Sequence, residues 1–488
     1  MHTRHTFLVS ALALSVGAAA QNLTDAQITL IKTRLAQSAN QSWELGTRAQ
    51  ALLELESPSL SVLSPVRLPP PTTLNSTTLA NFTTVVSIAE AVVAARPTGT
   101  APQPLIANGA AGDPASLGVA VIMANWTGQG NSSVNYADAA TQELQYLLTK
   151  VPQTSDGAIS HRQEQVELWS DFVYMVPPFL AYYGVTSQNR TLLTQAYTQI
   201  SLYRSHLRDL NASVNPYNTT TSPPSSPSLS SAPQANPGVG LWSHIILGNA
   251  TDLGHWSTGN GWAAAGMLRV LGTIKNSQYA NVMKGQIKDL GKWVDEIHDA
   301  IYPHLQPSGL FFNYADNNSS FQDAASTALL AATVYRQALL TGTHRHLPAA
   351  EKSRKALFSP SINNTSQAPS PTTSTKPKST TTSSASASTS VDSTALINMA
   401  HFTADGYLTP VVNPHQFGIE LVPNDATSGA ENLPGSPEAQ AFVLELQAAW
   451  RDWVAKGSPG ANGAISLGRG RVGVVVGWVL VGVLVGFL

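Results

Sequence analysis

The sequence contains no cysteine, and this absence excludes disulfide bonds, thiolate metal sites and a cysteine nucleophile. Charged residues are also scarce, at 11% of the 488 residues, and the formal net charge is only −2. Such a charge balance argues against nucleic acid or an anionic membrane as a partner. Hydrophobic residues make up 43% of the chain, which is enough for a sizeable core. The length allows two or three average domains or one large helical barrel.

An apolar segment at the start of the sequence indicates secretion. Residues 1–20 combine a basic start at Arg4, an apolar run from Phe7 to Val16 and small residues through Ala20. This order is typical of a secretory signal peptide, and the apolar run is too short for a transmembrane anchor. N-x-S/T sequons recur along the rest of the chain, as is common in heavily glycosylated eukaryotic surface proteins.

A second apolar segment closes the sequence. Residues 458–488 contain small residues, a polar spacer and an apolar tail from Val472 to Leu488. This order is that of a GPI-anchor signal with attachment near Asn462, and a tail-anchored helix is the alternative. We therefore expect an extracellular protein at the cell surface, attached to the plasma membrane or cell wall through the anchor only. Cleavage of both signals would remove three arginines and no acid, which again argues against nucleic acid as a partner.

Helical periodicity dominates residues 21–457, and alternating strand patterns are scarce. A capping box at Thr24 starts the first expected helix. Further helices are expected near residues 78–95, 115–125, 134–150, 163–184, 189–209, 261–275, 278–300, 321–341 and 436–455. Helices of ordinary length without a heptad repeat favour antiparallel hairpins that close into a toroid.

Two low-complexity stretches interrupt this domain. Residues 215–238 and 362–392 are rich in serine, threonine and proline, and such segments cannot bury a core. We expect both to be extended, O-glycosylated surface loops. Helical sequence resumes after the second stretch, so that this insert interrupts the domain and does not end it.

Asp171 lies in the most informative segment, residues 155–184. Its neighbours Trp169, Phe172 and Met175 are apolar, so we expect the carboxylate to be poorly solvated. Desolvation raises the pKa of a carboxyl group, which suits a general acid. An equally good reading is a buried aspartate that caps a chain end or pairs with an arginine. We expect the Pro177-Pro178 pair to kink or restart the helix.

Asp113 supplies a second carboxyl group, in "NGAAGDPASLGVAV". Because Pro114 follows it, a plain helix N-cap explains Asp113 without any chemistry. The separation from Asp171 is about one helical hairpin plus loops, so both acids can occupy equivalent points at one end of a barrel.

The stretch "HWSTGNGW", residues 255–262, places Trp256 and Trp262 on either side of Asn260 and two glycines. Asn260 is a good helix N-cap, and small residues allow close approach to the backbone. Aromatic faces beside polar groups are surfaces on which sugar rings stack. The alternative is a well-capped core helix.

Four segments in order carry a resemblance to a known family: "GDPASLGVAV", "DGAISHR…LWSDFVYMVPPFL", "GLWSH" and "HWSTGNGW". Together they resemble the unsaturated rhamnogalacturonyl and glucuronyl hydrolases, glycoside hydrolase families 105 and 88, and the end signals indicate a fungal GPI-anchored member. The resemblance spans residues 105–341 and returns at "DGYLTPVVNP", residues 405–414. It implies an all-α fold, a six-hairpin (α/α)6 barrel with its active site at one mouth.

The resemblance also assigns roles to individual residues. It implies that Asp171 acts as general acid and base and that Asp113 is the second active-site aspartate. The residues that it implies for substrate binding are His161, Trp169, His244, Trp256, Asn260 and Trp262.

The implied reaction is hydration of the 4,5 double bond of an unsaturated uronic acid at the non-reducing end of lyase-generated oligosaccharides of the rhamnogalacturonan or pectin type. It needs no metal or organic cofactor, and the expected partner is the oligosaccharide alone, bound by a monomer. One alternative is a GPI-anchored carbohydrate-binding protein without turnover. Another is a wall-remodelling glycosidase of the kind that uses adjacent aspartates, although the sequence has no Asp-Asp pair.

One position departs from the family pattern. Thr258 stands where the family usually has an arginine, and threonine cannot make the bidentate contact that arginine makes with a carboxylate. Either Arg162, Arg204 or another cation takes over this contact, or the ligand differs, or activity is weak.

Overall fold

The computed structural model describes residues 22–211, 238–361, 399–422 and 433–461. The predicted signal peptide, the predicted anchor signal beyond residue 461 and almost all of the two Ser/Thr/Pro-rich stretches lie outside these ranges, so the predictions about them stay predictions.

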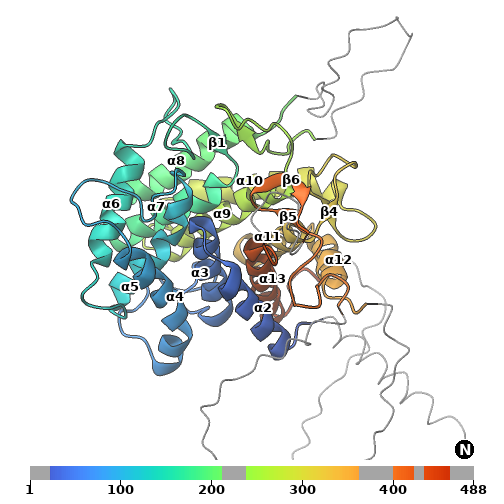
Figure 1. Cartoon of the computed structure of the whole chain (residues 1–488), viewed down its shortest axis with the longest axis horizontal. Helices are drawn as coiled ribbons and strands as arrows, with labels where there is room; N and C mark the ends of the chain where they lie inside the picture. Colours follow the sequence, from blue (N-terminus) through green and yellow to red (C-terminus); the bar gives the residue numbers. More distant parts are fainter. Residues whose placement is uncertain (1–21, 212–237, 362–398, 423–432, 462–488) are drawn as a thin grey trace, which may run out of the picture.

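Six helices form a closed inner ring in which each helix contacts the next and the last contacts the first. In order around the ring they are α3 (Ser42–Glu56), α5 (Gly118–Thr127), α7 (Phe172–Thr186), α9 (Ser257–Asn276), α11 (Ala324–Thr341) and α13 (Pro437–Ala455). Figure 1 shows α3 and α13 side by side, so the chain closes where its blue and red ends meet.

A second layer of helices surrounds this ring. It consists of α2 (Asp25–Ser38), α4 (Ser76–Ala94), α6 (Tyr136–Thr149), α8 (Arg190–Leu207), α10 (Lys284–Ile301) and α12 (Leu347–Leu357). Five of these pack against an inner helix next to them in sequence, whereas α2 packs against α13. The predicted all-α (α/α)6 barrel is therefore confirmed.

The sequence of each helix matches its layer. Every residue of α9 from Ser257 to Ile274 is buried, as an inner helix requires, whereas α10 buries one stripe that contains Leu290, Val294 and Ile297. By length and composition α4 is apolar enough to cross a membrane. Helix α4 lies in the outer layer, and its apolar side packs against the inner helices α3 and α5.

Several predicted boundaries were wrong. The helix expected from residue 163 begins only at Phe172, because the preceding residues form a loop that ends in β1 (Leu168–Trp169), paired with β2 (Ile245–Ile246). Helix α9 begins at Ser257 with Trp256 as its N-cap, so Asn260 lies inside the helix and does not cap it. Helices α3 and α12 were not predicted.

The Pro177-Pro178 pair lies inside one continuous helix, α7, so the predicted restart of the helix is wrong. Proline at 178 removes the N–H that would bond to the carbonyl of Tyr174. A side chain supplies the missing donor, since Arg269 Nη1 on α9 donates to this oxygen at 2.9 Å. The helix therefore continues because its neighbour satisfies the freed carbonyl group.

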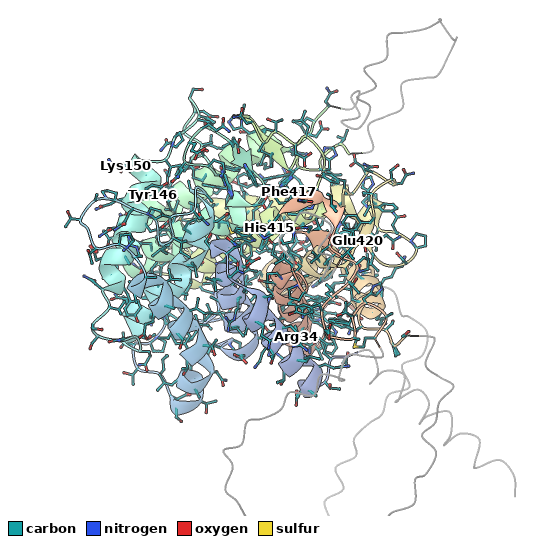
Figure 2. The ribbon with its side chains drawn as sticks, in the orientation of Figure 1. Arg34, Tyr146, Lys150, His415, Phe417 and Glu420 are labelled. Carbon is teal, nitrogen blue, oxygen red and sulfur yellow. The ribbon has the colours of Figure 1, made fainter. Side chains whose placement is uncertain are left out.

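Short turns and hairpins fill the mouth of the barrel at which the inner helices begin. They are the 3-10 turns η1 (Asp113–Leu117) and η2 (Tyr302–His304), the pair β3 (Phe311–Phe312) and β4 (Gln322–Asp323), and the hairpin of β5 (Val412–Asn413) and β6 (Gln416–Glu420). Figure 2 shows His415 and Phe417 on this last hairpin, over the centre of the molecule.

Both Ser/Thr/Pro-rich stretches leave and re-enter the fold at a single point. Before the first stretch, Asp209 exchanges backbone hydrogen bonds of 2.8 Å with Gly240 and Leu241 beyond it. Around the second, Pro360 and Met399 form an antiparallel bridge. The ends of each insert are therefore held together by the folded domain.

Candidate active site

A cavity of about 240 Å³ lies at the mouth where the N-terminal ends of α3, α7, α9 and α13 converge around η1. Helix N-termini favour negatively charged groups through their exposed N–H groups and dipoles. The residues that line the cavity are Trp43, Asp113, His161, Arg162, Trp169, Asp171, Met175, Trp256, Pro414, His415, Phe417 and Glu438.

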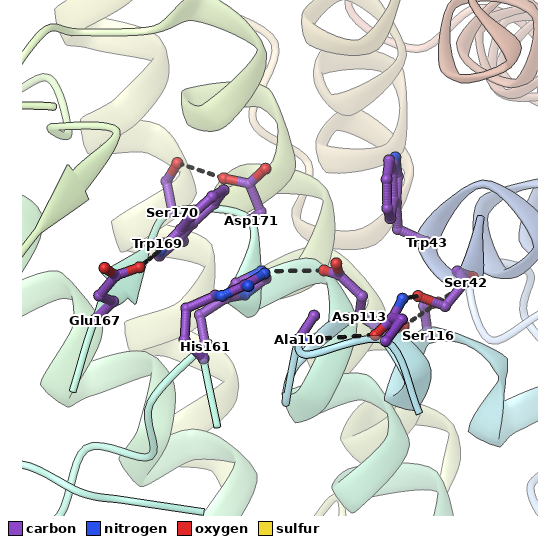
Figure 3. Close-up of polar contacts among 12 residues, drawn as sticks. Ser42, Trp43, Ala110, Asp113, Ser116, His161, Glu167, Trp169, Ser170 and Asp171 are labelled. Atoms are coloured by element: carbon purple, nitrogen blue, oxygen red, sulfur yellow. Dashed lines mark hydrogen bonds and ion pairs between the residues drawn. The ribbon is translucent and has the colours of Figure 1, made fainter. Parts of the chain in front are cut away.

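Asp113 and His161 form a polar pair within this cavity. His161 Nε2 lies 3.1 Å from Asp113 Oδ1, as Figure 3 shows. Asp113 is the first residue of η1, and Gly112 holds the N-cap position, so the N-cap explanation does not hold. Gly112 allows the approach, because a Cβ at this position would lie 2.8 Å from His161 Nδ1.

Trp169 forms an aromatic wall of the cavity. Its ring stacks on His161 with centroids 4.8 Å apart and an interplanar angle of 15°. Its indole Nε1 donates to Glu167 Oε2 at 3.0 Å, which fixes the orientation of the ring. The indole also borders a second, outer cavity of about 360 Å³, which Arg162 lines as well.

Asp171 is the N-cap residue of α7, yet its side chain does not cap the helix. It is 8% exposed, and its Oδ2 accepts a hydrogen bond of 3.0 Å from Ser170 Oγ. Burial raises the pKa of Asp171 above its ordinary value; His244 and His161 act in the opposite direction, and Asp113 adds to the rise. A carboxyl group with a raised pKa in a cavity is suited to proton transfer.

His244 lies beside Asp171, and Asp252 on its other side orients the ring. Its Nδ1 lies 2.9 Å from Asp252 Oδ2, which also accepts from the Tyr314 hydroxyl at 2.6 Å. The opposite nitrogen, Nε2, is 3.8 Å from Asp171 Oδ2 and makes no hydrogen bond within the described ranges. Asp252 thus directs His244 Nε2 towards the Asp171 carboxyl group.

Trp256 and Phe417 supply an apolar side. Their ring centroids are 5.2 Å apart, and each ring contacts His244 at about 4.5 Å. The indole of Trp256 donates to Asn313 Oδ1, whose amide in turn donates to the Phe417 carbonyl. The hairpin that carries Phe417 is thereby tied to the start of α9.

Two residues predicted to bind substrate lie away from the cavity. Asn260 is fully buried, and its amide bonds to the Trp242 backbone N–H and to the carbonyls of Trp242 and Trp256. Trp262 packs in the barrel core, 4.3 Å from the Tyr174 ring. The structure gives both residues a structural role in place of the predicted sugar contact.

Thr258 also lies outside the cavity. It is fully buried, and its hydroxyl lies 3.4 Å from Asp323 Oδ2. Of the two arginines considered as substitutes, Arg204 forms an ion pair with Glu296 between α8 and α10. Arg162 lines the cavity and forms no side-chain ion pair among the described residues. Arg162 is therefore the arginine available to an anionic ligand.

The cavity residues that sequence reasoning missed include Trp43, His415, Phe417 and Glu438. Trp43 is on an unpredicted helix, and Glu438 looks like an ordinary acid in a first helical turn. His415 directly follows "DGYLTPVVNP", so this segment was the one available signal.

Across the described ranges, one group of side chains has the spacing of a metal site: Asp295, Asp299 and His346. It lies outside the cavity. Arg345 pairs with both aspartates at 2.7 and 2.8 Å. Its guanidinium group therefore already balances the charge of these carboxylates.

Comparison with known proteins agrees with this geometry. The profile of Glycosyl Hydrolase Family 88 matches residues 119–379. The chain belongs to this family. As a family 88 member it is a glycoside hydrolase, and the catalytic prediction of a hydrolase is confirmed at that level. No curated protein matches the sequence.

Solved structures share the fold of this family 88 protein at low identity. A possible member of the GH105 family from Klebsiella pneumoniae is 12% identical with a TM-score of 0.56, over 88% of this chain and 93% of that one. A similar protein from Salmonella enterica gives 13% and 0.55 over the same shares. A family 88 hydrolase from Bacteroides vulgatus gives 14% and 0.51, over 87% and 98%.

Proposed function

We propose that this hydrolase removes 4,5-unsaturated uronic acid from the non-reducing end of lyase-generated oligosaccharides, of the rhamnogalacturonan or pectin type. The observation that carries the proposal is the Asp171 carboxyl group, buried in the cavity and 3.8 Å from His244. Hydration of a vinyl ether needs an acid at one carbon and a base for the water at the next. A single carboxyl group with a raised pKa can serve as both in turn.

In the proposed reaction Asp171 first protonates C4 of the unsaturated sugar. Water then adds at C5 and gives its proton to the Asp171 carboxylate, which restores the acid. The resulting hemiketal opens, the ring C–O bond breaks, and the next sugar leaves as an alcohol after rearrangement. Asp113 and His161, 3.1 Å apart, hold water and sugar hydroxyl groups. Such proton transfer contributes about 10²–10⁴-fold in rate.

The two adjoining cavities suit an oligosaccharide. The inner cavity holds the carboxyl groups, and the outer one shares Arg162 and Trp169 with it. We assign the unsaturated uronate to the inner cavity and the remaining sugars to the outer one. Arg162, at the border, is positioned to bind a negatively charged group of the oligosaccharide.

Ultraviolet absorbance tests this function directly. Hydration destroys the conjugation between the double bond and the carboxylate, so absorbance falls as product forms, whereas ordinary hydrolysis leaves the chromophore intact. We expect the wild-type protein to bleach at least one unsaturated rhamnogalacturonan disaccharide. Asp171→Asn should lower kcat by about 10²-fold or more and retain binding. Binding without bleaching by the wild type would identify a sugar-binding protein instead.

We further propose that the protein is secreted and GPI-anchored, on the order of signals at residues 1–20 and 458–488. Phospholipase treatment of intact cells should release it. Protein that stays in the membrane and retains its residues after 471 by mass spectrometry would show a transmembrane tail.

A further inference from the structure

Glu438 brings a third carboxyl group to the cavity that holds Asp113 and Asp171. It lies in the first turn of α13 and is 5% exposed. Its Oε1 accepts a hydrogen bond from the indole Nε1 of Trp43 on α3. In Figure 3, Trp43 lies on the side of Asp113 away from His161. Glu438 therefore belongs to the wall where the first and last inner helices meet.

The surroundings of Glu438 are mainly acidic. The charged and titratable groups that share its cavity come from several elements and are Asp113, His161, Arg162, Asp171 and His415. Glu44 on α3 also acts on its charge. Within the described ranges, no lysine or arginine forms an ion pair with Glu438. Burial, followed by Glu44, raises the pKa of Glu438 well above its ordinary value, although the Trp43 hydrogen bond acts in the opposite direction.

The hydrogen bonds leave one carboxyl oxygen for a ligand. Oε1 is taken by Trp43, and Oε2 has no hydrogen-bond partner among the described residues. A protonated carboxyl group is a donor as well as an acceptor, and a carboxylic acid kept neutral by its site can bind an anion in this way. Three ionised carboxylates in about 240 Å³ would instead repel an anionic sugar.

We propose that Glu438, as a neutral acid, donates a hydrogen bond from Oε2 to the carboxylate of the bound uronate. Glu438 thereby makes a contact with the uronate carboxylate, which Thr258 cannot make in place of the family arginine. This inference rests on the proposed function for the identity of the ligand, but it concerns binding and not the chemical step. Glu438 is a specificity-determining residue that selects an anionic sugar through a hydrogen bond from a neutral group.

The proposal has a defined pH dependence. The hydrogen bond exists while Glu438 is protonated and turns into repulsion once Glu438 ionises. Binding is therefore strongest at low pH and weakens as pH rises through the pKa of Glu438, by up to about tenfold in Kd for each pH unit. Other titratable groups line the same cavity, so the test must isolate Glu438.

Calorimetric titration of the Asp171→Asn protein isolates binding, because turnover is expected to be slower by about 10²-fold or more. The probes are the unsaturated rhamnogalacturonan disaccharide and its methyl ester, from mildly acidic to mildly alkaline pH. Adding Glu438→Gln keeps a neutral donor and the acceptor for Trp43, whereas the histidines stay as they are. Glu445→Gln is the matched control, because Glu445 is a buried acid on the same helix that bonds to Tyr174 in the core.

We expect equal Kd values at acidic pH for the proteins with and without Glu438→Gln. At higher pH the Kd of the protein that retains Glu438 should rise more steeply, and Glu445→Gln should follow that steeper curve. The difference should vanish with the methyl ester. Parallel curves for the acid, no binding of the disaccharide at all, or a difference that persists with the ester would each overturn the proposal. Binding without bleaching by the wild type would overturn only the proposed reaction.

Discussion

At the scale of single residues, His298 shows how burial sets a protonation state. Its ring is fully buried between α10 and α11, with nitrogens 2.8 Å from Gln337 Oε1 and Thr333 Oγ1. Burial, reinforced by His346, lowers the pKa of His298 from 6.5 to about 3, although the Gln337 hydrogen bond acts in the opposite direction. Between these values the unfolded chain binds one more proton than the folded protein, so the folded state loses stability as pH falls.

We therefore predict that the free energy of unfolding falls by about 1.4 kcal/mol for each pH unit below 6.5 through this residue alone. Urea unfolding at several pH values measures the slope. His298→Leu loses two hydrogen bonds and is less stable near neutral pH, but its slope should be shallower by that amount. Identical slopes in the two proteins would show that His298 is protonated in the folded state.

Sequence reasoning found two of the three acids and one of the two histidines that line the cavity, because these residues lie in local sequence motifs. Asp113, His161, Trp169, Asp171 and Trp256, named as site residues from the sequence, all line the cavity, and their catalytic and binding roles stay predictions. Asn260 and Trp262 were placed there by their motif, yet helix α9 turns both into the core. Glu438 was missed because its partner Trp43 is 395 residues away, and no local pattern records such a contact.

At the scale of elements, close packing of α7 on α9 depends on Gly266. A Cβ at this position would lie 2.0 Å from the Val173 carbonyl oxygen. We predict that Gly266→Ala lowers the free energy of unfolding by about 1–3 kcal/mol, because the helices must separate. Gly285→Ala on α10 is the matched control, since a Cβ there meets nothing within 4 Å. It should stabilise by up to about 1 kcal/mol. Similar Tm changes in both variants would contradict this packing argument.

Helix prediction succeeded where apolar periodicity was strong and failed where tertiary contacts determine the start or the continuity of a helix. Patterns near 189–209 and 436–455 correspond to α8 and α13. The loop before Phe172 is held by its pairing with Ile245 and Ile246, a partner that lies far along the chain. Helix α7 continues through its two prolines, and Arg269 on the neighbouring helix satisfies the Tyr174 carbonyl group that Pro178 leaves without a donor.

At the scale of the whole molecule, the two inserts are separable from the barrel. Ser359 accepts a hydrogen bond of 3.0 Å from the Ala400 N–H across the base of the second insert. We predict that replacing residues 362–398 with a short Gly/Ser linker leaves Tm and kcat/KM unchanged, because loop closure depends only weakly on length. The same holds for residues 212–237. A clear fall in Tm would show that an insert contributes to the folded core.

The contact between α3 and α13 also depends on the order in which the chain is synthesised. Trp43 is synthesised 395 residues before Glu438, and the cavity has no complete wall until the two meet. A polypeptide that stops before Pro437 contains Asp171, His161 and His244. It lacks α13, the helix that closes the inner ring. A product of translation that stops before Pro437 is therefore expected to be inactive, and activity requires the synthesis of the last inner helix.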